Sequence, residues 1–190
     1  MAQNSNSHKN GLAVRTVVAI GIGAALFFVL MRFLPIPTGI PDTTINLGSA
    51  ILALFAAIFG PIAGLFIGLI GHSLNDLTWG SVWWSWVIAD GAFGFLLGLI
   101  KKRLDLENGN LTRRKLIYFN VWQAVAGLIA WVVIAPLGDI FIYSEPANKV
   151  FVQGIVAWIT TFIAVAVVGS ILVVAYAKSR TQSGSLTKED

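Results

Sequence analysis

The chain has 190 residues, of which 56% are hydrophobic and only 12% charged, and its mean hydropathy is +0.79. Soluble domains carry about 25% charged residues, so this composition excludes an ordinary soluble protein and indicates an integral membrane protein. Cysteine is absent, which excludes disulfides, thiolate nucleophiles and cysteine metal sites. The net charge of +4 comes from basic residues at the ends of apolar runs, a pattern typical of membrane topology rather than of nucleic-acid binding.

Polar segments flank a long apolar region. Residues 1–11 form a polar N-terminal tail, and residues 179–190 form a polar C-terminal tail that we expect to be disordered. Residues 12–178 then make up one membrane domain. The first apolar run is longer than the ~7–15 residues of a signal-peptide core, so we expect it to be retained as a helix.

Apolar runs occur at residues 13–34, 46–60, 61–79, 82–100, 115–136 and 148–177. A spanning helix needs about 20 residues, and residues 46–79 are too long for a single one. Gly60 and Pro61 interrupt this stretch, because proline lacks an amide hydrogen and clashes with the preceding helical turn. The sequence therefore predicts an all-α integral membrane protein built as a bundle of six transmembrane helices.

The distribution of lysine and arginine predicts the orientation of this bundle. If both termini are inside, eleven of the thirteen basic residues lie on the cytoplasmic side, and only Arg32 and Lys149 lie outside. A five-helix model that fuses the second and third runs would lose this asymmetry. We therefore expect an N-in, C-in protein.

Polar and aromatic side chains gather on both sides of the predicted outer turn between the third and fourth helices. On the third helix they follow the spacing i, i+3, i+4, i+7, at His72, Asn75, Asp76 and Trp79. On the fourth helix they follow the spacing i, i+3, i+7, at Trp83, Trp86 and Asp90. A charge at the bilayer centre costs at least ~2.5–3.5 kcal/mol, so such residues usually face a cavity or a partner. We expect the two stripes to line an outward-facing pocket.

Simpler interpretations of these residues stay open. Trp83 and Trp84 suit an interfacial tryptophan belt, and Asp76 suits a turn cap in the headgroup region. Asp90 would also be satisfied by pairing with Arg32 or Lys149. His72 and Asp76 are spaced as two metal ligands, but no third ligand lies nearby in the sequence, so no metal site is expected.

The later helices supply further polar groups. Lys149 and Gln153 share a face at the outer end of the sixth helix, although Lys149 also suits a snorkelling interfacial lysine. Trp131 lies in the outer half of the fifth helix, where its indole can stack on a ring. Asn120 and Gln123 lie nearer the cytoplasm, and we expect them to form interhelical hydrogen bonds.

The predicted outer connection between helices one and two, residues 34–42, is rich in proline. Pro35, Pro37 and Pro41 prevent helix formation, and Gly39 offers a pivot between them. This segment is expected to act as a lid over the pocket or, alternatively, as an ordinary rigid connector.

The first helix carries two pairs of small residues four positions apart, Ala19 with Gly23 and Gly21 with Ala25. Small residues at this spacing let another helix approach closely. The pairs predict a helix-docking face, either toward another protein or within the bundle.

Motifs of several enzyme classes are absent from the sequence. It contains no Walker A phosphate loop, no HExxH motif and no convincing Ser–His pair for intramembrane proteolysis. We therefore expect a non-enzymatic membrane protein without a cofactor of its own.

Three segments resemble the substrate-binding S components of energy-coupling factor (ECF) vitamin transporters, in the riboflavin-transporter-like group that includes the hydroxymethylpyrimidine and pyridoxine types. They are VRTVVAIGIGAALFFVLMRF, PIPTGIPDTTINLGSAILALFAAIFGPIAGLFIGLIGH and WGSVWWSWVIADGAFGFLLGLIKK. The resemblance covers about residues 12–178. It implies a six-helix subunit of the bacterial plasma membrane that captures a vitamin or vitamin precursor outside.

The resemblance also implies partners and site residues. The first helix would dock on a membrane T component, which couples it to two ATPase subunits that hold ATP and Mg²⁺. The loop from Pro35 to Asp42 would gate the pocket. The pocket would use the outer parts of helices four, five and six, at Trp84, Trp86, Asp90, Trp131, Asn148 and Gln153. The residues alone also allow a stand-alone proton-coupled carrier or a structural membrane protein.

Overall fold

The computed structural model describes residues 3–41 and 43–180, with side chains from residue 14 onward. Its elements are α1 (Gln3–Phe33), β1 (Ile36–Pro37), β2 (Thr44–Ile45), α2 (Gly48–Phe59), α3 (Pro61–Leu77), α4 (Trp84–Gly98), α5 (Lys101–Leu104), η1 (Leu106–Asn108), α6 (Arg113–Gly127), η2 (Leu128–Ile134), α7 (Ala135–Tyr143), α8 (Ala147–Ala164), η3 (Val165–Gly169) and α9 (Ser170–Lys178). The expected all-α architecture is thus confirmed, with one two-stranded sheet added in the loop after α1.

The long helices are built from several elements in series. Helices α6, η2 and α7 form one continuous rod, and α8, η3 and α9 form another; η2 and η3 are π-helical turns. In the described part of the chain, three helices are long and apolar enough to cross a membrane: Val14–Phe33, Arg113–Tyr143 and Ala147–Lys178. Helix α4 and the segment Lys101–Asn108, bent by 41° relative to each other, would add a fourth if the pair forms one span. Helices α2 and α3, with 12 and 17 residues, are shorter, so the count of six spans stays a prediction.

The predicted helical break at Gly60 and Pro61 is confirmed. Helix α2 ends at Phe59, and α3 begins at Pro61. Gly60 between them has a φ of 95°, a left-handed conformation that glycine adopts without steric cost. Proline at the first helical position loses no hydrogen bond, because that amide has no acceptor within the helix.

Two predicted helix ends differ from the structure. Helix α1 extends back to Gln3, into the polar segment 1–11. The fifth run was expected to end at residue 136, but its helix continues to Tyr143. Local π-helical turns can accommodate a proline within a membrane helix, and the π-helical η2 directly precedes Pro136 in this chain. Of the C-terminal tail 179–190, predicted to be disordered, residues 181–190 lie outside the described residues.

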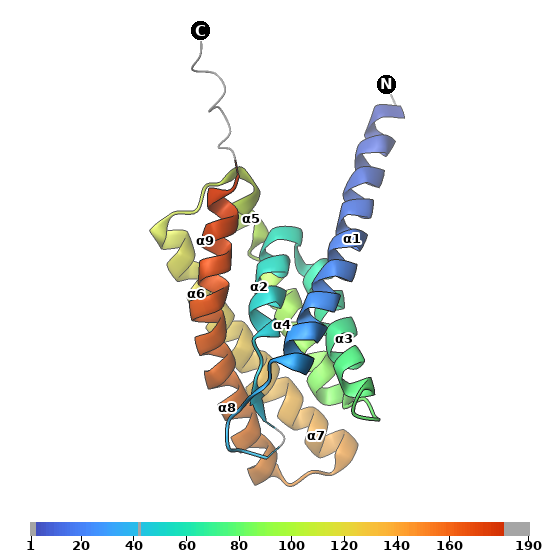
Figure 1. Ribbon diagram of the computed structural model, residues 1–190, viewed down its shortest axis with the longest axis vertical. Coiled ribbons are helices and arrows are strands. Elements are labelled where there is room, and N and C mark those ends of the chain that lie inside the picture. The colour runs from blue at the N-terminus through green and yellow to red at the C-terminus, as the bar shows by residue number, and fades with distance from the viewer. Residues whose placement is uncertain (1–2, 42, 181–190) are drawn as a thin grey trace.

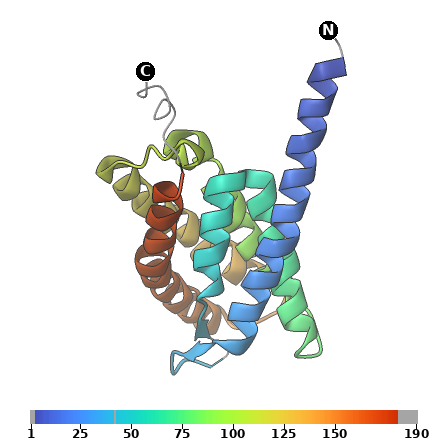
Figure 2. The same cartoon turned by 45° about the horizontal axis from the view of Figure 1, so that its top comes forward.

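Figures 1 and 2 show how the elements are arranged. The start of α1 and the end of α9 lie at the same end of the bundle, and α1 projects beyond its neighbours there. The β1–β2 loop lies at the opposite end, where Ile36 pairs with Ile45 and Pro37 with Thr44. This loop therefore lies at the end of the bundle that is remote from the start of α1 and the end of α9.

Helices α3 and α4 approach each other so closely that their contact requires glycine. A Cβ atom on Gly64 would lie 2.2 Å from the carbonyl oxygen of Gly94, and one on Gly94 would lie 2.3 Å from that of Gly64. Gly68 is similarly close to the backbone of Asp90. This contact brings the polar stripes of α3 and α4 against each other and so positions the site.

We predict that Gly94→Ala destabilises the bundle by about 1–3 kcal/mol, because the added methyl group forces α3 and α4 apart. A lower thermal unfolding temperature in detergent would measure this loss. Gly21→Ala is the matched control, since a Cβ at Gly21 meets no atom within 4 Å. Equal unfolding temperatures for both variants would contradict the proposed role of the α3–α4 contact.

Candidate functional site

A cavity of about 610 Å³ lies between the β1–β2 loop and the helices beneath it. Its lining comes from α1, the loop, α2, α3, α4, η2, α7 and α8, together with residues next to them. Eight of the ten predicted site residues line it: His72, Asn75, Asp76, Trp79, Trp86, Asp90, Trp131 and Gln153. The other two do not, since Trp84 is 52% exposed on the outer surface and Asn148 is exposed at the start of α8.

The centre of the site is a buried network around Asp90. The Nδ1 atom of His72 lies 2.6 Å from Asp90 Oδ2, and the indole of Trp131 donates to Asp90 Oδ1 at 3.1 Å. His72 Nε2 lies 3.3 Å from Asp76 Oδ1, so the imidazole bridges two carboxylates. Asp90 is thus paired with His72 and not with Arg32, whose guanidinium lies 4.3 Å from the ring centre of Trp79.

Asp76 also holds the turn between α3 and α4. Its Oδ2 accepts a hydrogen bond of 2.9 Å from the backbone amide of Trp83, and its Oδ1 accepts one from Asn75. Asp76 is buried rather than placed at an exposed surface. No group of three or more metal-ligating side chains occurs among the residues that the structure describes, so His72 and Asp76 have no third ligand there.

A third buried carboxylate, Asp139 on α7, was not predicted. Its Oδ1 accepts hydrogen bonds from the indole of Trp83 at 2.6 Å and from the hydroxyl of Ser85, and its Oδ2 accepts one from the indole of Trp86 at 2.9 Å. Asp139 thereby fixes two tryptophans of the cavity wall. A charged residue inside the apolar stretch PLGDIFIY was the signal that could have found it.

Aromatic rings form much of the cavity wall. Trp83 lines the cavity and stacks on Tyr143 with ring centres 4.3 Å apart. The tryptophan-belt interpretation had placed this residue at the membrane interface. Trp131 packs on Phe93 with ring centres 4.6 Å apart. With Trp79 and Trp86, these indoles line the cavity.

The β1–β2 loop is fastened over the cavity. Gln153 on α8 donates a hydrogen bond of 3.0 Å to the carbonyl of Pro41, and Thr38 donates one of 2.7 Å to the carbonyl of Thr43. Of the predicted gate residues, Pro35 lines the cavity, Pro37 lies in β1, and Gly39 has a φ of 84°. Near the loop, Lys149 pairs with Glu145 at 2.9 Å.

The two small-residue pairs of α1 face in different directions. Ala19 and Gly23 are buried, and a Cβ on Gly23 would meet the side chains of Ile67 and Phe55. Gly21 and Ala25 are exposed. The first pair therefore serves packing within the bundle, and only the second is available to another molecule.

The interhelical role predicted for Asn120 and Gln123 is confirmed. Asn120 donates to Ser170 Oγ at 2.9 Å, and Gln123 donates to the carbonyl of Phe162 at 3.2 Å. Both bonds tie α6 to the rod of α8, η3 and α9. They lie outside the cavity lining and hold the bundle together.

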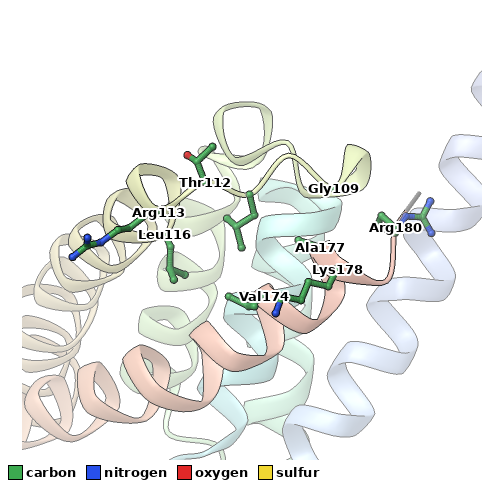
Figure 3. A pocket seen from close by; sticks show the side chains of 9 residues that line it. Gly109, Thr112, Arg113, Leu116, Val174, Ala177, Lys178 and Arg180 are labelled. Atoms are coloured by element: carbon green, nitrogen blue, oxygen red, sulfur yellow. The ribbon is translucent and has the colours of Figure 1, made fainter. Parts of the chain in front are cut away.

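A second cavity, of about 480 Å³, lies at the other end of the bundle between α6, α9 and the segment before α6 (Figure 3). Its lining includes Arg113, Lys178 and Arg180, and Arg113 and Arg180 lie on opposite sides of it in Figure 3. It contains no predicted site residue and no aromatic side chain. The cavity under the β1–β2 loop is therefore the candidate site.

We predict that Asp139→Asn destabilises the protein by about 1–3 kcal/mol, because the amide group cannot accept from all three donors, the indoles of Trp83 and Trp86 and the hydroxyl of Ser85. A lower unfolding temperature, with a shifted tryptophan emission spectrum, would measure this effect. Asp105→Asn is the control, since Asp105 is on an exposed turn with a φ of 54°, which asparagine tolerates. Native-like stability and emission in Asp139→Asn would contradict the positioning role.

Comparisons with known proteins show the family of this chain. The family model described as "ECF-type riboflavin transporter, S component" matches residues 11–178. Proteins named UPF0397 are similar to this chain over nearly their whole length. One from Leuconostoc citreum is 60% identical, and the match covers 97% of this chain and 99% of the relative. One from Lactiplantibacillus plantarum is 55% identical, and the match covers 96% of this chain and 98% of the relative. One from Staphylococcus aureus is 52% identical, covering 95% and 99%. No solved structure matches the chain. The chain belongs to the family of S components of ECF-type riboflavin transporters.

Proposed function

We propose that this S component captures a water-soluble vitamin or vitamin precursor with a flat heteroaromatic ring at the outer face of the bacterial plasma membrane. The cavity under the β1–β2 loop, walled by tryptophans and buried polar groups, is the observation that carries the proposal. Its volume of about 610 Å³ falls within the roughly 300–1,000 Å³ of small-molecule sites.

Stacking between indoles favours a planar ligand. A good stack of a ring on an aromatic side chain contributes about 1–3 kcal/mol, by analogy with nucleic-acid bases. Hydroxymethylpyrimidine and pyridoxine are the favoured ligands, because each is a small ring with hydrogen-bond donors. Riboflavin, which the family description names, is the third candidate.

The proposed orientation is N-in and C-in with six spans, which places the β1–β2 loop outside. Basic residues at Lys101–Arg103 and Arg113–Lys115 then lie on the cytoplasmic side. Release of the hydrogen bond between Gln153 and Pro41 would free the loop and open the cavity to the outside. Cargo release inside would follow tilting of the whole subunit.

The proposed partners are a membrane T component and two ATPase subunits, which bind ATP and Mg²⁺. The exposed Gly21–Ala25 pair supports docking through α1, since large apolar side chains such as Val18 and Ile22 are also exposed on this helix. Small residues let a partner helix approach closely without loss of apolar contact.

A stand-alone proton-coupled carrier is the second candidate, because the buried His72–Asp90 pair could carry a proton. The two functions differ in their energy source. Uptake by a carrier would collapse with an uncoupler while ATP persists, whereas uptake by an ECF importer would depend on the ATPase subunits.

We predict that the detergent-purified protein binds one vitamin with submicromolar affinity in native mass spectrometry with hydroxymethylpyrimidine, pyridoxine, riboflavin and thiamine. The ring would stack on the indoles and leave the aqueous solution. The comparison is the same measurement with Asp139→Asn, in which the single amide oxygen replaces the two carboxylate oxygens that hold Trp83 and Trp86, and binding weakens. Absence of binding to any of the four vitamins would contradict the proposed capture function.

We predict that Gly21→Leu or Ala25→Leu lowers co-purification with co-expressed T and ATPase subunits about tenfold, which corresponds to about 1.4 kcal/mol. Leucine would keep the partner helix from close approach, while the cavity and vitamin binding stay unchanged. Val121→Phe on α6, at a position that is 58% exposed, tests whether added bulk elsewhere has the same effect. Normal co-purification of the α1 variants would exclude this docking face.

A further inference from the structure

Two buried polar atoms at the candidate cavity have no hydrogen-bond partner within the described part of the chain. They are Oγ of Ser49, a residue 1% exposed, and Oδ1 of Asn75, a residue 6% exposed. Ser49 lies in the first turn of α2 and Asn75 in the last turn of α3, and both residues line the cavity. Native proteins pair nearly all buried polar atoms, so two exceptions at one cavity point to a ligand that pairs with them.

The carboxylates around the same cavity are already paired within the protein. Asp90 accepts from Trp131 and contacts His72, and Asp139 accepts from two indoles and one hydroxyl. Asp76 accepts from a backbone amide and from the amide group of Asn75. A ligand donor directed at Asp90 or Asp139 would therefore compete with hydrogen bonds that the protein already makes.

We propose that Ser49 and Asn75 form the polar subsite that recognises the ligand, whereas Asp90 and Asp139 are positioning residues that hold the tryptophans. This inference rests on the proposed capture function. Asn75 Oδ1 accepts from an exocyclic amino or hydroxyl group of the ring. The Ser49 hydroxyl donates to a ring nitrogen. The chemical class that satisfies both is a nitrogen heterocycle with an exocyclic hydrogen-bond donor.

This division of roles gives the site its selectivity. Indole stacking accepts any flat ring, so it contributes affinity without choosing among vitamins. A site built to hydrogen-bond a polar group rejects an analogue that lacks this group, because the polar atoms of the site are then left buried and unpaired. Discrimination among heterocycles should therefore depend on Ser49 and Asn75.

The test combines protein variants with ligand analogues. Dissociation constants are measured for wild type, Asn75→Ala and Ser49→Ala with two ligand pairs: hydroxymethylpyrimidine and its analogue with hydrogen in place of the amino group, and pyridoxine and its 4-deoxy analogue. The parent vitamin to compare is the one that wild type binds more tightly. We expect Asn75→Ala to weaken its binding about tenfold, because one buried hydrogen bond is lost, and to leave binding of its analogue unchanged. Ser49→Ala removes a single oxygen atom, and we expect it to weaken binding of both members of the pair severalfold.

Asn120→Ala is the matched control, because Asn120 also has a buried Oδ1 without a partner but lies outside the cavity lining. We expect this variant to bind the parent vitamin as wild type does. If wild type binds a parent vitamin and both Ser49→Ala and Asn75→Ala bind it equally well, the polar subsite is excluded while the capture function stands. If wild type binds none of the four ligands, the proposed capture of these heterocycles fails, and the subsite fails with it.

Discussion

The buried carboxylate of Asp90 sets the main constraint on this structure, because a carboxylate among apolar helices is stable only when donors surround it. His72 on α3 and Trp131 on η2 supply these donors. The network therefore joins α3 and α4 to η2, which lies much later in the chain. Asp139 repeats the arrangement. Its donors are the indole of Trp86 on α4 and the indole of Trp83, the residue directly before α4. Asp90 and Asp139 are costly to bury, and the same two residues fix the tryptophans of the cavity wall.

Close helix packing makes this network possible. Gly64, Gly68 and Gly94 remove the side chains that would separate α3 from α4, and the backbones meet directly. His72 is then within hydrogen-bonding distance of Asp90. The stability of the bundle and the geometry of the site therefore depend on the same contact between α3 and α4. The glycines let the two helices approach, and this approach lets His72 reach Asp90.

The arrangement explains how a small membrane protein can hold a cavity lined by buried polar groups while the outer surface of its bundle stays apolar. Exposed valine, isoleucine and leucine residues cover α1, α6 and the rod of α8, η3 and α9. The polar groups lie inside, beneath a loop that is anchored to α8 through Gln153. Membership of the ECF S-component family accounts for this combination, since such a subunit must stay in lipid and also bind a substrate.

The sequence by itself determined the membrane class, the helical hairpin at Gly60–Pro61 and the polar stripes of α3 and α4, because composition, proline chemistry and helical periodicity are local properties. It did not predict Asp139, since the fifth apolar run ends at residue 136 in the sequence, whereas the helix continues through a π-helical segment to Tyr143. Only the tertiary structure decided that Ala19 and Gly23 face inward while Gly21 and Ala25 face outward. Tertiary structure also decided which polar atoms pair with each other, because hydrogen bonds between distant segments depend on how the helices pack. Within the described part of the chain it left Ser49 Oγ and Asn75 Oδ1 without a hydrogen-bond partner.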